Sequence, residues 1–254
     1  LSPVREELLV ARVENLGESP FKGTVRLVGV NGAAPLVTQK TLELAAGESA
    51  AALTFRLASD AGPDLYAGLR IESKGGVVLE LPAVRFRVLP DAMLAGCKIV
   101  PDGDAKIAST QTVLNTSAPQ PLPGADAQAV KVSYRCDDGW KFFRLVPQGD
   151  ALRPIEGEPK AFGFWIYGTG SKISPRLRVL DTTQQCWQPG GDMIDWEGWR
   201  FVQLELNPSS GHWGGAQDGV IHYPLRWDSL FLLDNVGRQK TEGTVFIAAP
   251  VVIY

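Results

Sequence analysis

The sequence is poor in the residues that build disulfide or metal scaffolds. It has three cysteines (Cys97, Cys136 and Cys186) and two histidines in 254 residues, and no CxxC pair. Cysteines this few and this scattered cannot form the dense framework of small secreted domains, and at most one bridge could join them. We therefore expect the cysteines to act as small, buried apolar side chains.

Long apolar runs and an excess of one charge are also missing. No stretch approaches the roughly 20 consecutive apolar residues that a membrane-spanning helix needs. The 25 basic and 28 acidic residues are intermixed and give a formal net charge of -3. This pattern offers no basic patch, so we expect neither a nucleic-acid partner nor a membrane partner. A hydrophobic content of 44% instead indicates a folded globular chain.

Tryptophan is absent from the first 90 residues and frequent afterwards. All seven tryptophans lie between Trp140 and Trp227. The first region ends at a proline-containing segment, residues 90–92, which is the expected domain boundary. We therefore expect two domains, residues 1–90 and residues 91–254. The chain begins at Leu1 without an initiator methionine, and we interpret it as a segment of a longer protein.

The first region shows the alternation of apolar and polar residues that is typical of short β-strands. The runs are closed by Gly, Asn or Pro and cover residues 8–13, 23–28, 40–44, 50–57, 65–72 and 77–88. Strands at this spacing, with no convincing helix, predict an immunoglobulin-like β-sandwich. Residues 13–28 (VENLGESPFKGTVRLV) resemble the accessory β-sandwich domains of multidomain bacterial surface and glycan-acting proteins.

The second region also predicts strands and leaves no room for helical crossovers. The expected strands are residues 97–100, 129–135, 140–147, 161–168, 176–181, 184–188, 199–206, 230–234 and 245–254. The turn at residues 137–139 predicts a hairpin between its two flanking strands. The natural arrangement of so many strands is an antiparallel two-sheet sandwich.

Four segments of the second region resemble, in order and spacing, the jelly-roll carbohydrate-binding modules attached to bacterial glycoside hydrolases. They are FGFWIYGTGS (162–171), RLRVLDTTQQCWQ (176–188), IDWEGWRFVQLEL (194–206), and the pair YPLRWDSLFLLDNVG (223–237) and GTVFIAAPVVIY (243–254). The resemblance implies an all-β fold: an immunoglobulin-like sandwich followed by an antiparallel jelly roll. It further implies a non-catalytic module, extracellular or at the cell surface, with a polysaccharide or oligosaccharide ligand and a catalytic domain on the same parent chain.

The resemblance also implies a structural calcium, held in part by two acidic residues near the end of the last strand. Aligned from the C-terminus, these positions are Ala249 and Pro250 here. Neither side chain offers the hard oxygen ligand that calcium needs. We therefore expect no cofactor; a calcium site would have to use backbone carbonyls and Asp residues near the start of the module.

Sugars are bound by flat aromatic faces, with hydrogen-bonding side chains that fix their orientation. Strand alternation sends Leu177 and Val179 to the core and Arg176 and Arg178 to the open face. On the expected strand 184–188, two registers remain open. Either Trp187 shares the open face with these arginines and binds ligand, or its ring lies in the core.

Other aromatic residues extend the candidate binding set. Trp140 follows a turn and is placed to overhang the sheet edge, and Trp213 lies in a glycine-rich polar loop with little to bury it. Tyr223 and Trp227 flank Pro224 near the start of an expected strand. For these two residues, a role in binding and a role in packing are equally expected. The full set of expected carbohydrate-binding residues is Trp140, Arg176, Arg178, Trp187, Trp213, Tyr223 and Trp227. Trp196 and Trp199 belong to the segment that carries the resemblance and are expected to pack.

Two rival functions follow from the same residues. A glycan-degrading enzyme would need two carboxylates across a cleft, and Asp192, Asp195 and Glu197 are clustered but read as turn residues. His212 and His222 accompany no nucleophile motif and no metal-ligand spacing. The other rival is a structural or protein-interaction module in which the sandwiches act as spacers.

Overall fold

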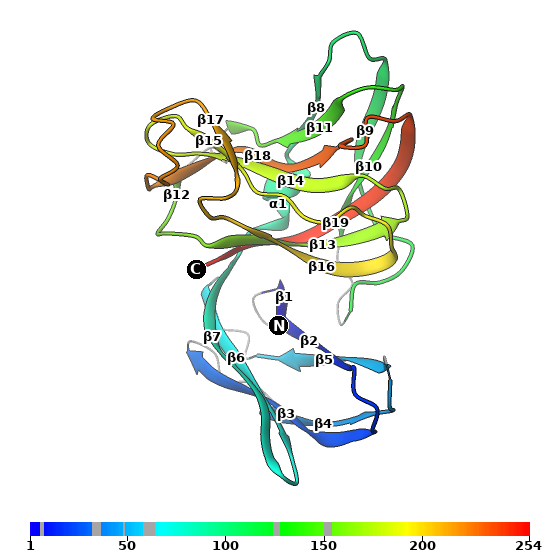
Figure 1. The fold of residues 1–254 in the computed structure, drawn as a ribbon, viewed down its shortest axis with the longest axis vertical. Helices are drawn as coiled ribbons and strands as arrows, with labels where there is room; N and C mark the ends of the chain where they lie inside the picture. Colours follow the sequence, from blue (N-terminus) through cyan, green and yellow to red (C-terminus); the bar gives the residue numbers. More distant parts are fainter. Residues whose placement is uncertain (6–7, 32–36, 48, 58–63, 124–127, 150–153) are drawn as a thin grey trace. The chain divides into compact units, whose positions relative to one another are not determined.

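The computed structural model describes residues 1–5, 8–31, 37–47, 49–57, 64–123, 128–149 and 154–254. The chain divides into two compact units, shown in Figure 1. Unit 1 is formed mainly by Leu1–Val88, and unit 2 mainly by Leu89–Leu122 and Asp126–Val252. All seven tryptophans lie in unit 2.

Unit 1 is built from antiparallel strands. They are β1 (Ser2–Arg5), β2 (Leu8–Asn15), β3 (Phe21–Asn31), β4 (Gln39–Leu44), β5 (Ser49–Arg56), β6 (Asp64–Ser73) and β7 (Gly76–Val88). One sheet has the order β1-β2-β5, and the pairs β7-β6, β6-β3 and β3-β4 belong to another. Alternating apolar residues such as Leu42, Phe55 and Leu65 are buried. The immunoglobulin-like assignment of this unit stays a prediction.

Unit 2 contains one helical turn and twelve strands among its described residues. The helical turn is α1 (Asp91–Ala95), which the sequence pattern did not predict. The strands are β8 (Lys98–Gly103), β9 (Ser109–Thr116), β10 (Ala129–Cys136), β11 (Lys141–Val146), β12 (Pro154–Ile155), β13 (Ala161–Thr169), β14 (Ser174–Leu180), β15 (Cys186–Gln188), β16 (Glu197–Glu205), β17 (Gly211–Trp213), β18 (Leu225–Asp234) and β19 (Thr241–Ile253).

The strands of unit 2 form two layers. One sheet has the order β17-β15-β14-β18-β11-β8, with β12 paired to β18; the other includes β16-β13-β19 and the pairs of β10 with β19 and β9. The two layers meet through rings: Phe164 of β13 lies 5.2 Å from Phe231 of β18, and Phe162 lies 4.9 Å from Trp227, measured between ring centroids. The predicted all-β, antiparallel sandwich is confirmed for this unit.

The predicted hairpin across residues 137–139 is wrong. β10 pairs with β9 and β19, whereas β11 pairs with β8 and β18, so the two strands belong to different sheets. The chain crosses from one layer to the other at Asp137. A turn signal fixes a reversal of direction, but it does not fix which strand becomes the hydrogen-bonded neighbour.

The three cysteines are buried, as the sequence predicted, and they are unpaired. Burial raises the pKa of the Cys97 thiol to about 12 and that of the Cys186 thiol to about 12, because the thiolate would lose its hydration. These thiols are therefore unreactive packing groups at neutral pH.

Candidate functional site

The site lies on the solvent-facing side of the sheet that contains β14. Leu177 and Val179 point into the core, while Arg176 and Arg178 point to the other face, as strand alternation predicted. Strand β11, which is separated from β14 by β18, alternates in the same way and brings Phe142 to the arginine face. Strand parity thus puts aromatic and cationic side chains from separate segments on one surface.

Four of these side chains form a continuous row, which we call the Trp140–Trp213 row (Trp140, Phe142, Arg178 and Trp213). The rings of Trp140 and Phe142 lie 5.2 Å apart. The guanidinium carbon of Arg178 lies 4.7 Å from the Phe142 ring centroid and 5.1 Å from that of Trp213. Both tryptophans at the ends of the row keep 45% of their surface exposed. The row therefore presents two large aromatic surfaces to solvent on a fixed support.

The register between β15 and β17 explains why Trp213 belongs to the row. Trp213 pairs with Cys186, whereas Trp187 pairs with His212. Adjacent residues on a strand face opposite sides of the sheet, so Trp213 and Trp187 are sent to opposite faces. Within the described residues β17 is the edge strand of this sheet, and Trp213 is 45% exposed.

Charged groups beside the row are paired with one another. Arg144 bridges two carboxylates: its Nη1 donates to Asp228 Oδ2 at 3.0 Å, and its Nε lies 3.4 Å from Asp102 Oδ2. Arg178 donates from Nε to the Gln188 amide oxygen at 2.6 Å and also faces Asp102. Burial lowers the pKa of Arg178, although it stays a cation at neutral pH. The result is a fixed set of donors and acceptors whose charges balance.

A second carboxylate supports the Trp140 end of the row. Asp234 is nearly buried, lies 2.9 Å from Arg176 Nε and accepts a hydrogen bond from the Trp140 side chain. Burial raises the pKa of Asp234, and the attraction of Arg176 opposes that rise only in part. Trp140 is therefore held by a polar contact as well as by its packing on Phe142.

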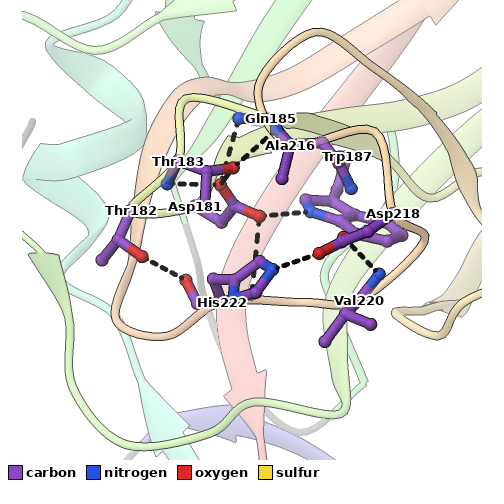
Figure 2. Close-up of polar contacts among 9 residues, drawn as sticks. All are labelled: Asp181, Thr182, Thr183, Gln185, Trp187, Ala216, Asp218, Val220 and His222. Carbon is purple, nitrogen blue, oxygen red and sulfur yellow. Dashed lines mark hydrogen bonds and ion pairs between the residues drawn. The ribbon is translucent and has the colours of Figure 1, made fainter.

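A third carboxylate, Asp181, organises the Trp213 end, and the sequence pattern gave it no role. Asp181 is buried in the turn between β14 and β15, and Figure 2 shows polar groups from separate segments converging on it. Its carboxylate accepts bonds from the turn residues Thr183 and Gln185 and from the Trp187 indole. Burial alone would raise the pKa of Asp181, but these hydrogen bonds outweigh it and lower the pKa. The local sequence signal for this role is an Asp at a turn.

The structure places three of the expected binding residues away from the row. Trp187 is fully buried, and its indole N–H donates to Asp181 at 3.2 Å, so of the two positions that the sequence left open it takes the core one, and its inclusion among the binding residues is wrong. Trp227 is a core residue packed against Phe162. Tyr223 is partly buried, packs against the core and donates its hydroxyl to the Pro159 carbonyl at 3.1 Å. In these positions none of the three rings is free to stack on a ligand.

Trp196 and Trp199 pack, as expected from the sequence. Trp196 is a core residue, with the Arg200 guanidinium 4.9 Å from its ring. Trp199 is partly buried on the other sheet, where it lies against Tyr167 and donates to the Gln120 carbonyl at 2.8 Å. Their packing leaves Trp140 and Trp213 as the tryptophans that are exposed within the described part of the chain.

A separate hollow of about 670 Å³ lies beside β16. Its lining residues are Gly190, Gly191, Asp192, Met193, Asp195, Trp196, Arg200, Phe201, Val202 and Gln203, and none belongs to the row. Within the described ranges, no group of three or more His, Cys, Asp or Glu side chains is placed to hold a metal ion. Ala249 and Pro250 lie within β19 and offer no side-chain oxygen, so the residues there do not fit the calcium site that the resemblance implied. No helix in the described ranges has the length and apolar character of a membrane span.

No protein-family model and no curated protein matches the chain. Among solved structures, it is similar to the family 11 carbohydrate-binding module of the cellulosomal cellulase Lic26A-Cel5E of Clostridium thermocellum. That match has 11% identity and a TM-score of 0.45, and it covers 66% of this chain and 93% of that chain. A family 11 module from Clostridium thermocellum in complex with a beta-1,3-1,4-mixed-linked tetrasaccharide gives 11% identity and a TM-score of 0.43, over 66% of this chain and 94% of the other.

A third structure comes from work on the promiscuous specificity of carbohydrate-binding modules of the β-sandwich superfamily. It gives 11% identity and a TM-score of 0.39, over 98% of this chain and 97% of that chain.

Proposed function

We propose that this chain is a non-catalytic polysaccharide-binding fragment. In this proposal residues 1–90 form an immunoglobulin-like domain and residues 91–254 a jelly-roll domain that binds the glycan. The observation that carries the proposal is the Trp140–Trp213 row, with a half-exposed tryptophan at each end and a hydrogen-bonding network beside it.

The chemistry of the row suits a sugar chain. The C–H face of a pyranose is apolar and stacks on an indole, while its hydroxyl rim needs donors and acceptors. Here Trp140 and Trp213 supply two stacking surfaces, and Arg176, Arg178 and Gln188 supply polar groups on the same face. Two stacking surfaces on one row favour a chain of several sugar units over a single monosaccharide.

The balanced charges beside the row favour an uncharged ligand. A polyanionic glycan would be attracted by unpaired cations, but Arg144 and Arg176 are each engaged by a carboxylate. An anionic sugar would also meet the Asp102 and Asp228 carboxylates. The same network can offer hydrogen bonds to neutral hydroxyl groups without a net electrostatic cost.

Binding of this kind would target or position a glycan-active catalytic domain elsewhere on the parent chain, outside the cell or at its surface. No chemical step is assigned to the row, because the carboxylates beside it are engaged by arginines and a tryptophan. The polysaccharide is the expected partner, and no cofactor is required.

The test is affinity-gel electrophoresis of the chain through gels that contain neutral or anionic polysaccharides. We expect retardation on at least one neutral polysaccharide, loss of retardation in the Trp140→Ala/Trp213→Ala double variant, and no release of reducing ends. Trp199→Phe is the matched control, because Trp199 is a partly exposed tryptophan on the other sheet. Migration unaffected by every polysaccharide would refute the proposal, and release of reducing ends would support the enzyme instead.

A protein-interaction module is the second candidate, and one observation in unit 1 favours it. Val77, Val78, Leu79 and Leu81 of β7 are all exposed. Contiguous exposed apolar side chains on a strand often mark a contact surface. Concentration-dependent self-association lost in a Val78→Lys/Leu79→Lys variant, together with no glycan binding, would favour this function.

A further inference from the structure

We infer that Asp181 and Thr183 are positioning residues, which hold the segment that follows Trp213 against the turn between β14 and β15 and so fix the Trp213 ring for its ligand. This inference rests on the proposed function only for the identity of the ligand. Neither residue belongs to the Trp140–Trp213 row, and both act through Trp213.

One oxygen of Asp181 fixes the turn itself. Asp181 Oδ1 accepts a hydrogen bond from the Thr183 N–H at 2.8 Å, from the Thr183 hydroxyl at 2.7 Å and from the Gln185 N–H at 3.0 Å (Figure 2). A buried carboxylate oxygen that accepts several hydrogen bonds holds each of its donors in a defined position. The positions of Thr183 and Gln185 are therefore set by Asp181.

The other oxygen of Asp181 contacts both a core residue, Trp187, and the residue that ends the loop after Trp213, His222. Asp181 Oδ2 accepts from the Trp187 indole at 3.2 Å and lies 3.4 Å from the His222 N–H. The His222 carbonyl in turn accepts bonds from the N–H and the hydroxyl of Thr182, at 3.1 and 3.3 Å. The loop that starts after Trp213 is thus anchored to the turn where it ends, at His222.

Thr183 anchors the start of the loop. Its hydroxyl accepts a hydrogen bond from the Ala216 N–H at 3.2 Å, while donating its own proton to Asp181. Gly215, at φ +57°, lies so close to the turn that an added Cβ would come within 2.3 Å of the Gln185 nitrogen. Only glycine allows that approach and that backbone conformation. The chain two to three residues after Trp213 is therefore clamped to the turn.

The clamp matters for Trp213 because little else holds its backbone. β17 has three residues, all of them exposed, and among the described strands it pairs with β15 alone. A short edge segment without further anchors would lose conformational entropy when it binds a ligand. Anchoring the segment before the ligand arrives removes that cost. By fixing Ala216 and His222, Asp181 and Thr183 let Trp213 keep its place over Arg178 before the ligand arrives.

Thr183 is the residue to change first, because Asp181 also holds the buried Trp187. Thr183→Val keeps the shape and removes the hydroxyl, and Thr183→Ser restores the hydroxyl. The ligand is the polysaccharide that retards the parent chain in the affinity gel. We expect Thr183→Val to weaken binding to it by about three- to tenfold, and Thr183→Ser to bind it like the parent chain. In a Trp213→Ala background, Thr183→Val should cost nothing further, since a positioning residue acts only through the residue that it positions. An equal loss in both backgrounds would overturn the inference.

A second readout does not depend on any glycan. The indole N–H of Trp213 should become more mobile in Thr183→Val and in Asp181→Asn, in ¹⁵N relaxation measurements, while that of Trp140 stays unchanged. If no polysaccharide binds but the Trp213 signal loosens in this way, the proposed function fails and the positioning role stands. If Trp213 mobility is unchanged in Thr183→Val, the positioning role fails, whatever the glycan results show.

Discussion

Two pairs of tryptophans in unit 2 have opposite environments. Trp187 and Trp227 are buried in the core, whereas Trp140 and Trp213 are half exposed at the ends of one row. Trp187 and Trp213 even lie on neighbouring strands of the same sheet. The difference teaches that strand parity and position relative to the sheet edge, and not residue type, decide which rings are available to a ligand.

The largest effect should come from the buried pair. Trp187→Ala removes a fully buried ring and leaves Asp181 without one of its donors. Its free energy of unfolding should fall by about 3–5 kcal/mol, the cost typical of large-to-small changes at buried aromatic positions. Urea denaturation followed by circular dichroism measures this loss. Trp213→Ala is the control and should change stability by less than about 1 kcal/mol; equal losses would contradict the division into two pairs.

The exposed pair should show the reverse pattern. Trp213→Ala and Trp140→Ala should each weaken polysaccharide binding by about tenfold or more, because each removes one of the two stacking surfaces of the proposed contact. Isothermal titration with the polysaccharide that retards the parent chain measures the affinity. Thermal unfolding should remain close to that of the parent chain. If one of these variants lost stability but kept its affinity, the replaced tryptophan would have a packing role, like Trp187 and Trp227, and not a binding role.

Arg178 links the two exposed rings, and its replacement should have a smaller effect. Arg178→Lys keeps the charge but loses the planar group that lies over both Phe142 and Trp213. We expect affinity to fall by about three- to fivefold in the same titration, from loss of roughly 0.5–1 kcal/mol. Arg135→Gln, an exposed position on the other sheet, is the control and should bind normally. Unchanged affinity in Arg178→Lys would remove this residue from the site.

Acid titration should separate the carboxylates that serve the two pairs. Asp181, which binds Trp187, has a lowered pKa, so its stabilisation is present above its unfolded pKa and is lost as pH falls through the folded value. Asp234, which binds Trp140, has a raised pKa, so its protonation in the folded state adds stability as pH falls and that gain is lost as pH rises through the folded value.

Denaturation midpoints measured between neutral and strongly acidic pH test these opposite signs. Asp181→Asn should flatten the acid-side loss of stability, and Asp234→Asn should make that loss steeper than in the parent chain. These effects should be the smallest of the set. Parallel profiles for both variants and the parent would show that neither carboxylate contributes as assigned.

Part of the site could be predicted from local sequence. Alternation on β14 placed Arg176 and Arg178 on the open face, and the glycine-rich surroundings of Trp213 predicted its exposure. These predictions succeeded because a single strand or loop contains all the information that they need. The burial of the cysteines followed from composition alone.

Other parts depended on pairings between distant segments. Trp187 lies opposite Val179, and that register sends its ring into the core with Val179. The turn at residues 181–185, with Gln184 at φ +69°, sets this register, and sequence alternation left both faces open. The hairpin predicted across residues 137–139 failed for a related reason, since the choice of neighbouring strand depends on the packing of two sheets. Asp181 was missed because its role depends on the turn geometry that brings Thr183, Gln185 and Trp187 to it, and on the His222 N–H from 41 residues away.

By itself, the sequence determined the class of this protein: short alternating strands, no membrane-spanning run, no basic patch, and tryptophan confined to the second region. Only the tertiary structure decided which tryptophans are exposed and which carboxylates support them. The physical reason is that hydrophobic periodicity is a local property of each strand, whereas a binding surface is made by the register and order of strands far apart in the chain. The row from Trp140 to Trp213 exists because β11, β14 and β17 meet in one sheet.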